Sequence, residues 1–268
     1  MASASTRRFL LCPPAFFDVT YAINPWMTSG VAVDRCRAWR QWERLRETYE
    51  LLGHKVDVID AVPGLPDMVF AANAGTVIHG TVLPTRFRVA ERRGEESRYR
   101  AWFEDHGYAV VSGEVPVNEG EGDLLLVGDL LLAGTGFRSE PAARGAAQEA
   151  FGLPTMPLQL VDPRYYHLDT ALGVLDDDTI AYYPPAFSEP SRRALERRFP
   201  DAVIAGETDA LALGLNLVSD GRHVVLADGA DGLAAQLADR SYEPIVVEMG
   251  EFKKSGGAVK CCTLELRS

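Results

Sequence analysis

The chain has 268 residues, of which 47% are hydrophobic and 24% are charged, and this is enough to bury a sizeable core. Its net charge is -11 and no run of Lys or Arg is longer than two residues, so the basic face of a nucleic-acid-binding protein is missing. The start of the chain, MASASTRRFLLCPP, has too few apolar residues for a secretory signal, and no apolar run approaches the length of a membrane span. We therefore expect neither a nucleic-acid partner nor membrane insertion.

The predicted elements follow a repeating order along the chain. The first part supplies a strand over residues 8–14, a long amphipathic helix over residues 33–53 and a strand over residues 55–61. Four segments then read as two short strands around a tight turn, with the turns at residues 79–80, 128–129, 176–178 and 220–221. Each hairpin is followed by an amphipathic helix and a single strand; the helices are predicted over residues 95–107, 141–152, 189–199 and 231–240, and the strands over residues 108–113, 156–162, 201–206 and 243–249. A last strand covers residues 261–266.

This order amounts to about five strand–strand–helix–strand units with a mean period of about 47 residues. Periods of this length are typical of solenoids. Five units with small sheets can instead close in a ring, which removes exposed sheet edges. The order of elements leaves both architectures open, and the length alone permits one large domain or two small ones.

Polar residues recur at one position of these units. They are Asn73 before the first hairpin, Glu119, Glu121 and Asp123 around the start of the second, His167 and Asp169 at the third, Asn216 at the fourth and Cys261 at the start of the last strand. The steps from one unit to the next are about 45–49 residues. Equivalent positions in a ring of repeats point at one axis, so a ring would bring these side chains together in a central pocket.

The residue types at this predicted centre suit one kind of chemistry. A Cys and a His are the usual pair of nucleophile and proton-transfer partner. Carboxylates beside them can hold a cation, keep a guanidinium polarised or orient the His. A protease depends on an oxyanion hole more than on a cluster of acids. The set therefore favours a small cationic substrate over a peptide amide.

The chain has four cysteines, Cys12, Cys36, Cys261 and Cys262. Two of them are adjacent, and neighbouring cysteines rarely pair with each other. No CxxC or Cys/His spacing suggests zinc. We therefore expect reduced thiols in a cytoplasmic protein, each of them either buried filler or a reactive group.

The candidate residues also have purely structural interpretations. Cys261 can fill a core, and its neighbour Cys262 implies that one of the two is buried if side chains alternate along a strand. His167 can be a hydrogen-bonded core histidine. Glu121 and Asp123 would share one face of a strand, and the apolar run that follows them indicates a half-buried place.

Seven motifs, in this order, resemble the guanidino-group modifying enzymes, a superfamily that includes arginine deiminases, dimethylarginine dimethylaminohydrolases, arginine dihydrolases and amidinotransferases. The motifs are LLCPPAFFDVTYAINPWM (10–27), MVFAANAG (68–75), ERRGEE (91–96), NEGEGDLLLVGDLLLAGTGFR (118–138), YYHLDTALGVL (165–175), GLNLVSDGRHVVL (214–226) and SGGAVKCCTLEL (255–266). They cover nearly the whole chain, and the HLD motif together with the glycines before the Cys is the specific combination. The resemblance implies one α/β-propeller domain over residues 1–268, with fivefold pseudosymmetric ββαβ repeats around a central active site that needs no metal and no cofactor.

The resemblance also implies roles for individual residues. Cys261 matches the nucleophile and His167 the general acid/base. The substrate-binding positions are Asn24 in a lid segment, Asn73, Asp123, Asp169 and the pair Arg92 and Arg138, which would grip an α-carboxylate. The stretch EGEGD has one residue more than the family pattern, so either Glu119 or Glu121 is the guanidinium-binding carboxylate; we favour Glu121. The pair Gly256–Gly257 would let a loop close over the site.

Asn73 bears on the choice of substrate. Hydrolases of methylated arginine usually have Asp there, whereas Asn is similar to arginine dihydrolases; an amide does not pin a second cationic nitrogen, so a second hydrolysis becomes feasible. The resemblance implies hydrolysis of a guanidino group through a covalent Cys amidino intermediate, with an arginine dihydrolase (ornithine, ammonia and CO2) as first choice. The alternatives are a dimethylargininase (citrulline plus dimethylamine), an amidinotransferase and a non-catalytic arginine-binding protein. The expected partner is a small molecule, arginine or N-methylated arginine, and homo-oligomerisation stays open.

Overall fold

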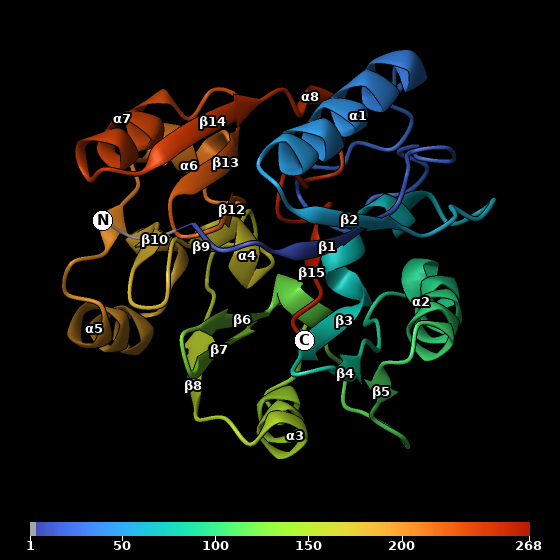
Figure 1. Ribbon diagram of the computed structural model, residues 1–268, viewed down its shortest axis with the longest axis horizontal. Helices are drawn as coiled ribbons and strands as arrows, with labels where there is room; N and C mark the ends of the chain where they lie inside the picture. The colour runs from blue at the N-terminus through green and yellow to red at the C-terminus, as the bar shows by residue number, and fades with distance from the viewer. Residues whose placement is uncertain (1–3) are drawn as a thin grey trace.

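The computed structural model describes residues 4–268, which form five three-stranded sheets around one axis (Figure 1). Each sheet has an inner strand near the axis, a middle strand antiparallel to it and an outer strand parallel to the middle one. A helix on the outside of the ring joins the middle strand to the outer strand. The predicted α/β propeller with fivefold ββαβ repeats is therefore confirmed, and the solenoid alternative is wrong.

The strands occupy equivalent places in the five sheets. The inner strands are β3 (Gly75–Ile78), β6 (Leu124–Val127), β9 (Leu172–Val174), β12 (Val218–Ser219) and β15 (Leu264–Glu265). The middle strands are β4 (Thr81–Pro84), β7 (Leu130–Thr135), β10 (Ile180–Tyr182), β13 (His223–Ala227) and β1 (Arg8–Leu11). The outer strands are β5 (Ala109–Val110), β8 (Thr155–Gln159), β11 (Val203–Ile204), β14 (Glu243–Val247) and β2 (Lys55–Val58).

The helices fall into two groups. The outer helices, one for each unit, are α1 (Arg35–Leu51), α2 (Arg93–Asp105), α3 (Ala142–Phe151), α5 (Glu189–Arg198) and α7 (Asp231–Asp239). Short helical turns lie between the units: α4 (Leu168–Ala171), α6 (Glu207–Leu211), α8 (Gly250–Lys253), and the 3-10 turns η1 (Pro66–Val69), η2 (Ala71–Ala74), η3 (Ala90–Arg92), η4 (Gly120–Gly122) and η5 (Pro184–Ala186). The amphipathic patterns predict the first group, whereas the short turns carry no such pattern.

The sequence explains the local geometry of these units. In the first hairpin, His79 and Gly80 have positive φ angles of 50° and 72°, which is the turn that matches the twist of a tight hairpin. The carboxylate of Asp34 accepts a hydrogen bond from the amide of Arg37 and caps α1. The apolar residues of α1, among them Trp42 and Leu45, pack on β1.

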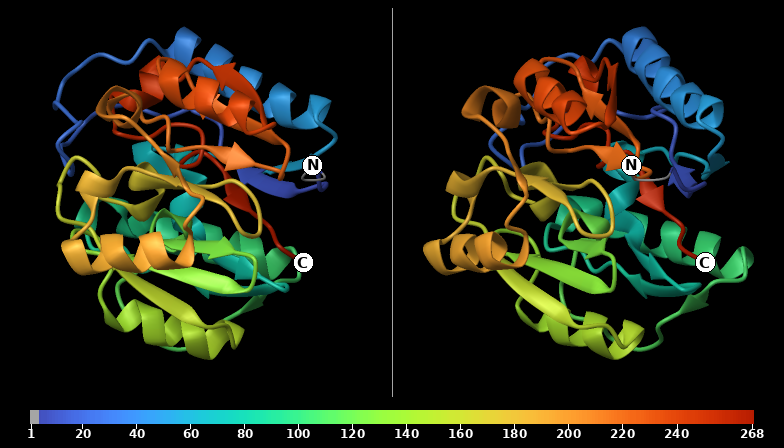
Figure 2. Two further views of the ribbon diagram at one scale, coloured as in Figure 1. Left: turned by 90° about the vertical axis from the view of Figure 1, so that its left-hand side faces the viewer. Right: turned by 60° about the vertical axis from the view of Figure 1, so that its left-hand side comes forward.

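Both ends of the described chain meet in one sheet. β15 pairs antiparallel with β1, Phe9 facing Glu265 and Leu10 facing Leu264, and β1 pairs in parallel with β2. The unit that the C-terminal strand begins is thus completed by the N-terminal elements, and this pairing closes the ring. The chain ends lie on one face of the ring, while the irregular segment between β1 and α1 crosses the other face (Figure 2).

Two local predictions are wrong. Cys261 does not start the last strand: β15 begins at Leu264, and Cys261 lies in the preceding turn, where it and Cys262 are both buried. Glu121 and Asp123 do not share a strand face, because they lie within and directly after η4 and are fully buried. A tight turn rather than an extended strand therefore carries the functional residues, and the alternation of side chains does not apply to it.

Buried apolar side chains form clusters that span neighbouring units and pack the sheets against the outer helices. One cluster joins Leu132 of β7 to Leu195 of α5 and Leu237 of α7, and another joins Phe9 to Trp42 and Leu45 of α1. Among residues 4–268, no helix has both the length and the apolar character needed to cross a bilayer.

Candidate active site

Each inner strand is preceded by a turn that carries polar side chains toward the axis. Asn73 lies in η2, Glu119 directly before η4, His167 directly before α4, Asp169 within α4, Asn216 before β12 and Cys261 before β15. All six are at most 2% exposed. The predicted convergence of residues far apart in the sequence is therefore present in the structure, and the following contacts define the site.

Cys261 is held by residues from two neighbouring units. Its Sγ lies 3.3 Å from Oδ2 of Asp169, to which the thiol donates, and 3.2 Å from Nδ2 of Asn216. The side-chain oxygen of Asn216 accepts a hydrogen bond from the amide of Cys261 at 3.0 Å. Burial raises the pKa of the Cys261 thiol, and the charge of Asp169 raises it further. Both effects favour the protonated form of the thiol over the thiolate.

His167 is oriented by Glu119. Its Nε2 lies 2.7 Å from Oε2 of Glu119, which also accepts from Arg138 at 2.9 Å. Burial alone would raise the pKa of Glu119, but the hydrogen bond from His167 and the charge of Arg138 lower it to about 2. Nδ1 of His167 is buried and has no hydrogen-bond partner. A buried ring nitrogen without a partner is free to exchange a proton with a bound substrate or water.

The stretch EGEGD depends on its two glycines. Gly120 has a φ of 57°, and a Cβ there would lie 2.6 Å from the carbonyl oxygen of Gly75. A Cβ on Gly122 would lie 2.5 Å from Nδ2 of Asn73 and 3.1 Å from Nδ1 of His167. The two glycines let the backbone pass directly beneath the site.

The same turn sends its acids in different directions, and this corrects the preference for Glu121. The carboxylate of Glu121 accepts from Lys260 and Arg267 and does not contact His167. Both oxygens of Asp123 are occupied as well, by Ser139 and by the backbone amide of Leu168. Glu119 is the carboxylate that the structure places beside the histidine.

The two predicted arginines lie on either side of Asn73 and Glu119. Arg92 donates to both oxygens of Glu95 and, through NH1, to Oδ1 of Asn73 at 2.7 Å. Arg138 donates to Glu119 and to the carbonyl oxygen of Ile23 at 2.8 Å. Both guanidinium groups are almost completely buried, with exposed fractions of 3% and 4%. Two buried guanidinium groups beside Asn73 and Glu119 suit the recognition of an anionic group.

Asp67 is a site residue that the sequence does not predict. Its Oδ2 accepts from the hydroxyl of Tyr21 at 2.9 Å, while its Oδ1 is buried without a partner. Burial raises the pKa of Asp67, and the charge of Arg92 opposes this rise. Asp67 lies just before MVFAANAG and outside the positions that recur from unit to unit, so no spacing indicates it.

Asn24 lies in the irregular segment that crosses the site, residues 18–33, which we name the lid segment. Its Oδ1 accepts from the amide of Trp26, and its Nδ2 donates to the carbonyl oxygen of Ser255 at 3.0 Å. The hydroxyl of Tyr166 donates to the carbonyl oxygen of Gly256. Asn24 thus ties the lid segment to the Gly256–Gly257 loop, and the site is closed.

Asn216 and Tyr166 also act in the site without a predicted role. The recurring spacing includes Asn216, but a neutral amide gives no sign that it will clamp a thiol. Tyr166 is adjacent to His167 in the sequence, and its ring lies under the guanidinium of Arg138 at 4.9 Å. Among residues 4–268, no group of three or more His, Cys, Asp and Glu side chains is arranged to hold a metal ion.

No family model matches the chain. The chain is 53% identical to N(G),N(G)-dimethylarginine dimethylaminohydrolase of Mycobacterium tuberculosis, over 97% of this chain and 86% of that protein. It is 39% identical to the bifunctional arginine dihydrolase/ornithine cyclodeaminase AgrE of Nostoc sp., over 97% of this chain but 38% of that longer protein. Among solved structures, an asparagine-to-serine variant of the N-terminal domain of ArgZ, covalently bound to a reaction intermediate, matches with a TM-score of 0.94 and 36% identity over 98% of both chains.

Proposed function

The chain belongs to the family of dimethylarginine dimethylaminohydrolases and arginine dihydrolases, the guanidino-modifying enzymes, and from this premise we propose that it hydrolyses the guanidino group of arginine or a modified arginine. The observation that carries the proposal is the buried pairing of Cys261 with Asp169 beside the His167–Glu119 pair. A thiol, a histidine and two carboxylates around a closed pocket suit attack on a cationic carbon. Pure binding would not require the thiol.

We assign the parts of the substrate to the charges of the pocket. Asp169 has a buried oxygen, Oδ1, without a partner, and this oxygen can accept from a guanidinium. Arg138 and Arg92 would bind the α-carboxylate. The partnerless Oδ1 of Asp67 and the carbonyl oxygen of Ile23 are acceptors that suit an α-amino group.

The chemical steps follow from these contacts. A guanidinium beside Asp169 supplies the positive charge that favours ionisation of Cys261. The thiol proton passes to His167, and the thiolate attacks the central carbon. The C–N bond to the leaving nitrogen then breaks, and His167 supplies the proton that the departing amine takes. Water, deprotonated by His167, attacks the covalent intermediate and releases a ureido product, so one arginine and one water give one citrulline and one ammonia.

We propose arginine dihydrolysis as the first choice of reaction. Asn73 presents a neutral amide whose Oδ1 is occupied by Arg92 and whose Nδ2 donates to the carbonyl oxygen of Glu119. Such an amide does not fix a second cationic nitrogen, so a second attack by Cys261 on the ureido carbon is feasible. One arginine and two waters then give ornithine, two ammonia and CO2.

A dimethylargininase is the second candidate, and the relative with 53% identity that carries this name favours it. Mass spectrometry of products decides between the two. The enzyme is incubated in parallel with arginine, asymmetric dimethylarginine and agmatine. Ornithine from arginine supports the first choice, whereas citrulline as the sole product from arginine contradicts it. Citrulline plus dimethylamine from the methylated substrate supports the second candidate.

The third candidate, an amidinotransferase, shares the covalent intermediate. An added amine such as glycine discriminates it, because a transferase transfers the amidino group to the amine and turns over slowly without it.

We place the reaction in the cytoplasm, since the four cysteines are unpaired and Cys36 is exposed, as is usual in a reducing compartment.

A further inference from the structure

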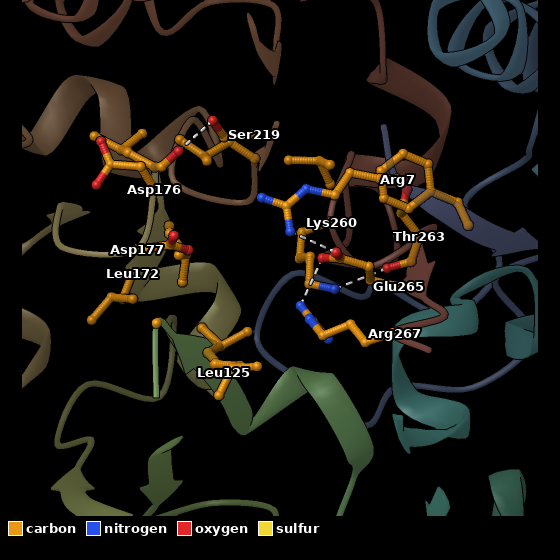
Figure 3. A pocket seen from close by; sticks show the side chains of 18 residues that line it. Arg7, Leu125, Leu172, Asp176, Asp177, Ser219, Lys260, Thr263, Glu265 and Arg267 are labelled. Carbon is orange, nitrogen blue, oxygen red and sulfur yellow. Dashed lines mark hydrogen bonds and ion pairs between the residues drawn. The ribbon is translucent and has the colours of Figure 1, made fainter. Parts of the chain in front are cut away.

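A cavity opens on the axis at the end away from the site. The active-site residues precede the inner strands, whereas this cavity is lined by residues within and after them, such as Leu172, Asp177 and Ser219. Its volume is about 120 Å³, and it lies on the face where the chain ends meet (Figure 3). We name it the rear cavity. Lys260 and Thr263 line it, so it brings solvent close to the turn that carries Cys261.

Lys260 forms the floor of the rear cavity. Figure 3 shows its side chain pointing into a group of charged residues that includes Glu265 and Arg267. Its Nζ donates to Oε2 of Glu121 and, at 3.0 Å, to the carbonyl oxygen of Thr263. Lys260 is only 8% exposed, and Glu121 is 1% exposed. This lysine is a buried, specifically held cation rather than a surface charge.

The buried carboxylate of Glu121 joins this cation to the C-terminal strand. Glu121 accepts from Arg267 as well as from Lys260, and from the backbone amide of Glu265 at 3.0 Å. Burial would raise the pKa of Glu121, but the charges of Arg267 and Lys260 lower it. Two cations therefore share one buried carboxylate, and Glu265 accepts from Arg267 at the mouth of the cavity.

Lys260 is linked to the reacting thiol in two ways. It immediately precedes Cys261, and its amide donates to the carbonyl oxygen of Asn216, the residue whose side chain clamps the thiol. Its charge also acts on Asp169: burial raises the pKa of Asp169 to about 6, and the charges of His167 and Lys260 oppose this rise. Asp169 in turn contacts Cys261 Sγ at 3.3 Å.

We propose that Lys260 is a positioning residue that supports, from behind, the negative charge that Cys261 and Asp169 share during the reaction. The other titratable groups around this pair are His167, Asp123, Cys262 and Tyr166. Of these, Asp123, Cys262 and Tyr166 carry no positive charge in any protonation state. His167 gains and loses a proton during the reaction, so Lys260 supplies the positive charge that stays constant. The carboxylate of Glu121 partly compensates this charge.

The test measures the thiol without any substrate. In a Cys36→Ser background, which removes the exposed thiol, Cys261 is alkylated with iodoacetamide across a pH series, and fragment spectra separate its adduct from that of Cys262. Lys260→Met should move the midpoint of the alkylation profile to higher pH by about 0.5–1 unit, because a cation that favours the thiolate is lost. Glu121→Gln should move it to lower pH, because the charge of Lys260 is then less compensated.

Shifts in opposite directions for Lys260→Met and Glu121→Gln distinguish an electrostatic role of Lys260 from a structural one. If the substitutions merely loosened the turn that carries Cys261, both alkylation profiles would move in the same direction. That outcome, or no shift in Lys260→Met, overturns the proposal. Lys260→Arg keeps the charge and should restore the profile; thermal unfolding of each variant shows whether it folds. In an Asp169→Asn background, Lys260→Met should shift the midpoint of the alkylation profile by a smaller amount. An unchanged shift would contradict the claim that the charge of Lys260 acts through Asp169.

The role proposed for Lys260 rests on the proposed function, because it concerns the reacting thiol. The alkylation test does not depend on that function. Alkylation requires no turnover, so a missing shift counts against Lys260 alone. Failure to hydrolyse any guanidino compound, with the shifts intact, counts against the proposed function alone. In an active enzyme, the pH profile of kcat should move in the same direction as the alkylation profile, and a kcat profile unmoved by Lys260→Met contradicts the proposal.

Discussion

The two ends of the propeller axis hold similar residues in opposite states. At the front, Oδ1 of Asp67, Oδ1 of Asp169 and Nδ1 of His167 are buried without partners. At the rear, the carboxylate of Glu121 accepts from two cations and a backbone amide. A buried polar atom without a partner costs about 1–3 kcal/mol, and a bound ligand can satisfy it. The comparison thus separates carboxylates with an oxygen left for a ligand from a carboxylate whose oxygens are both occupied within the protein.

Glu119 and Glu121 show the same contrast within one turn. They are two residues apart and equally buried, yet one orients His167 and the other pairs with Lys260 and Arg267. Burial and residue type therefore do not identify the acid that lies beside His167. The direction in which the backbone turns at Gly120 decides which carboxylate reaches the histidine.

The largest expected effect on kcat comes from a substitution at the active-site end of the axis. Cys261→Ser should lower kcat by about 10³-fold or more, because a serine hydroxyl in this buried place is far less nucleophilic than a thiolate. Steady-state assays with arginine and dimethylarginine measure it. Cys262→Ser is the matched control, since its side chain is also buried but, unlike that of Cys261, makes no hydrogen bond to Asp169, and it should retain turnover. Activity retained in Cys261→Ser, and lost in Cys262→Ser, would exchange the two assignments.

The next effect tests the proton partner. His167→Gln should lower kcat by about 10²–10⁴-fold, because the leaving amine and the attacking water lose their proton partner. Intact-mass spectra after mixing with substrate should show whether an adduct on Cys261 accumulates. A variant with wild-type kcat would remove His167 from the mechanism.

A third prediction concerns stability rather than rate. The folded pKa of Glu119, about 2, lies below its ordinary value of 4.5. This contributes on the order of 3 kcal/mol to the free energy of unfolding. A depressed carboxylate stabilises above its unfolded pKa, so the contribution is full above about pH 4.5 and is lost as the pH falls toward 2. Urea unfolding of the wild type and of Glu119→Gln should therefore converge at low pH; a constant difference down to pH 2 contradicts the assignment.

The smallest effect tests loop closure over the front. Gly257→Ala places a Cβ 2.4 Å from the ring of Phe70, so either the loop or the ring of Phe70 must shift. We expect kcat/KM to fall about tenfold, since closure excludes water and completes the site. Gly145→Ala in α3 is the control, because a Cβ there meets no atom within 4 Å. Equal activities of the two variants would mean that closure of this loop is not required.

Much of this architecture follows from the sequence. The hairpins, outer helices and recurring polar positions are predicted because each unit repeats the same local pattern. The identity of the acid beside His167 is not predicted, since it depends on a positive φ at Gly120 and on which cations surround each carboxylate. Asp67 and Lys260 are not predicted for a related reason: their importance depends on which side chains surround them in the fold, and no periodic spacing marks either of them.

The pairing of β15 with β1 has a consequence for biosynthesis. A ribosome makes β1 long before β15, so the sheet that closes the ring stays incomplete until the other four units have been synthesised. Cys261 lies immediately ahead of β15, and its partners Asp169 and Asn216 belong to units made earlier. The proposed nucleophile is therefore the last part of the site to be assembled, and a nascent chain that already contains His167 and Glu119 still lacks the thiol of Cys261.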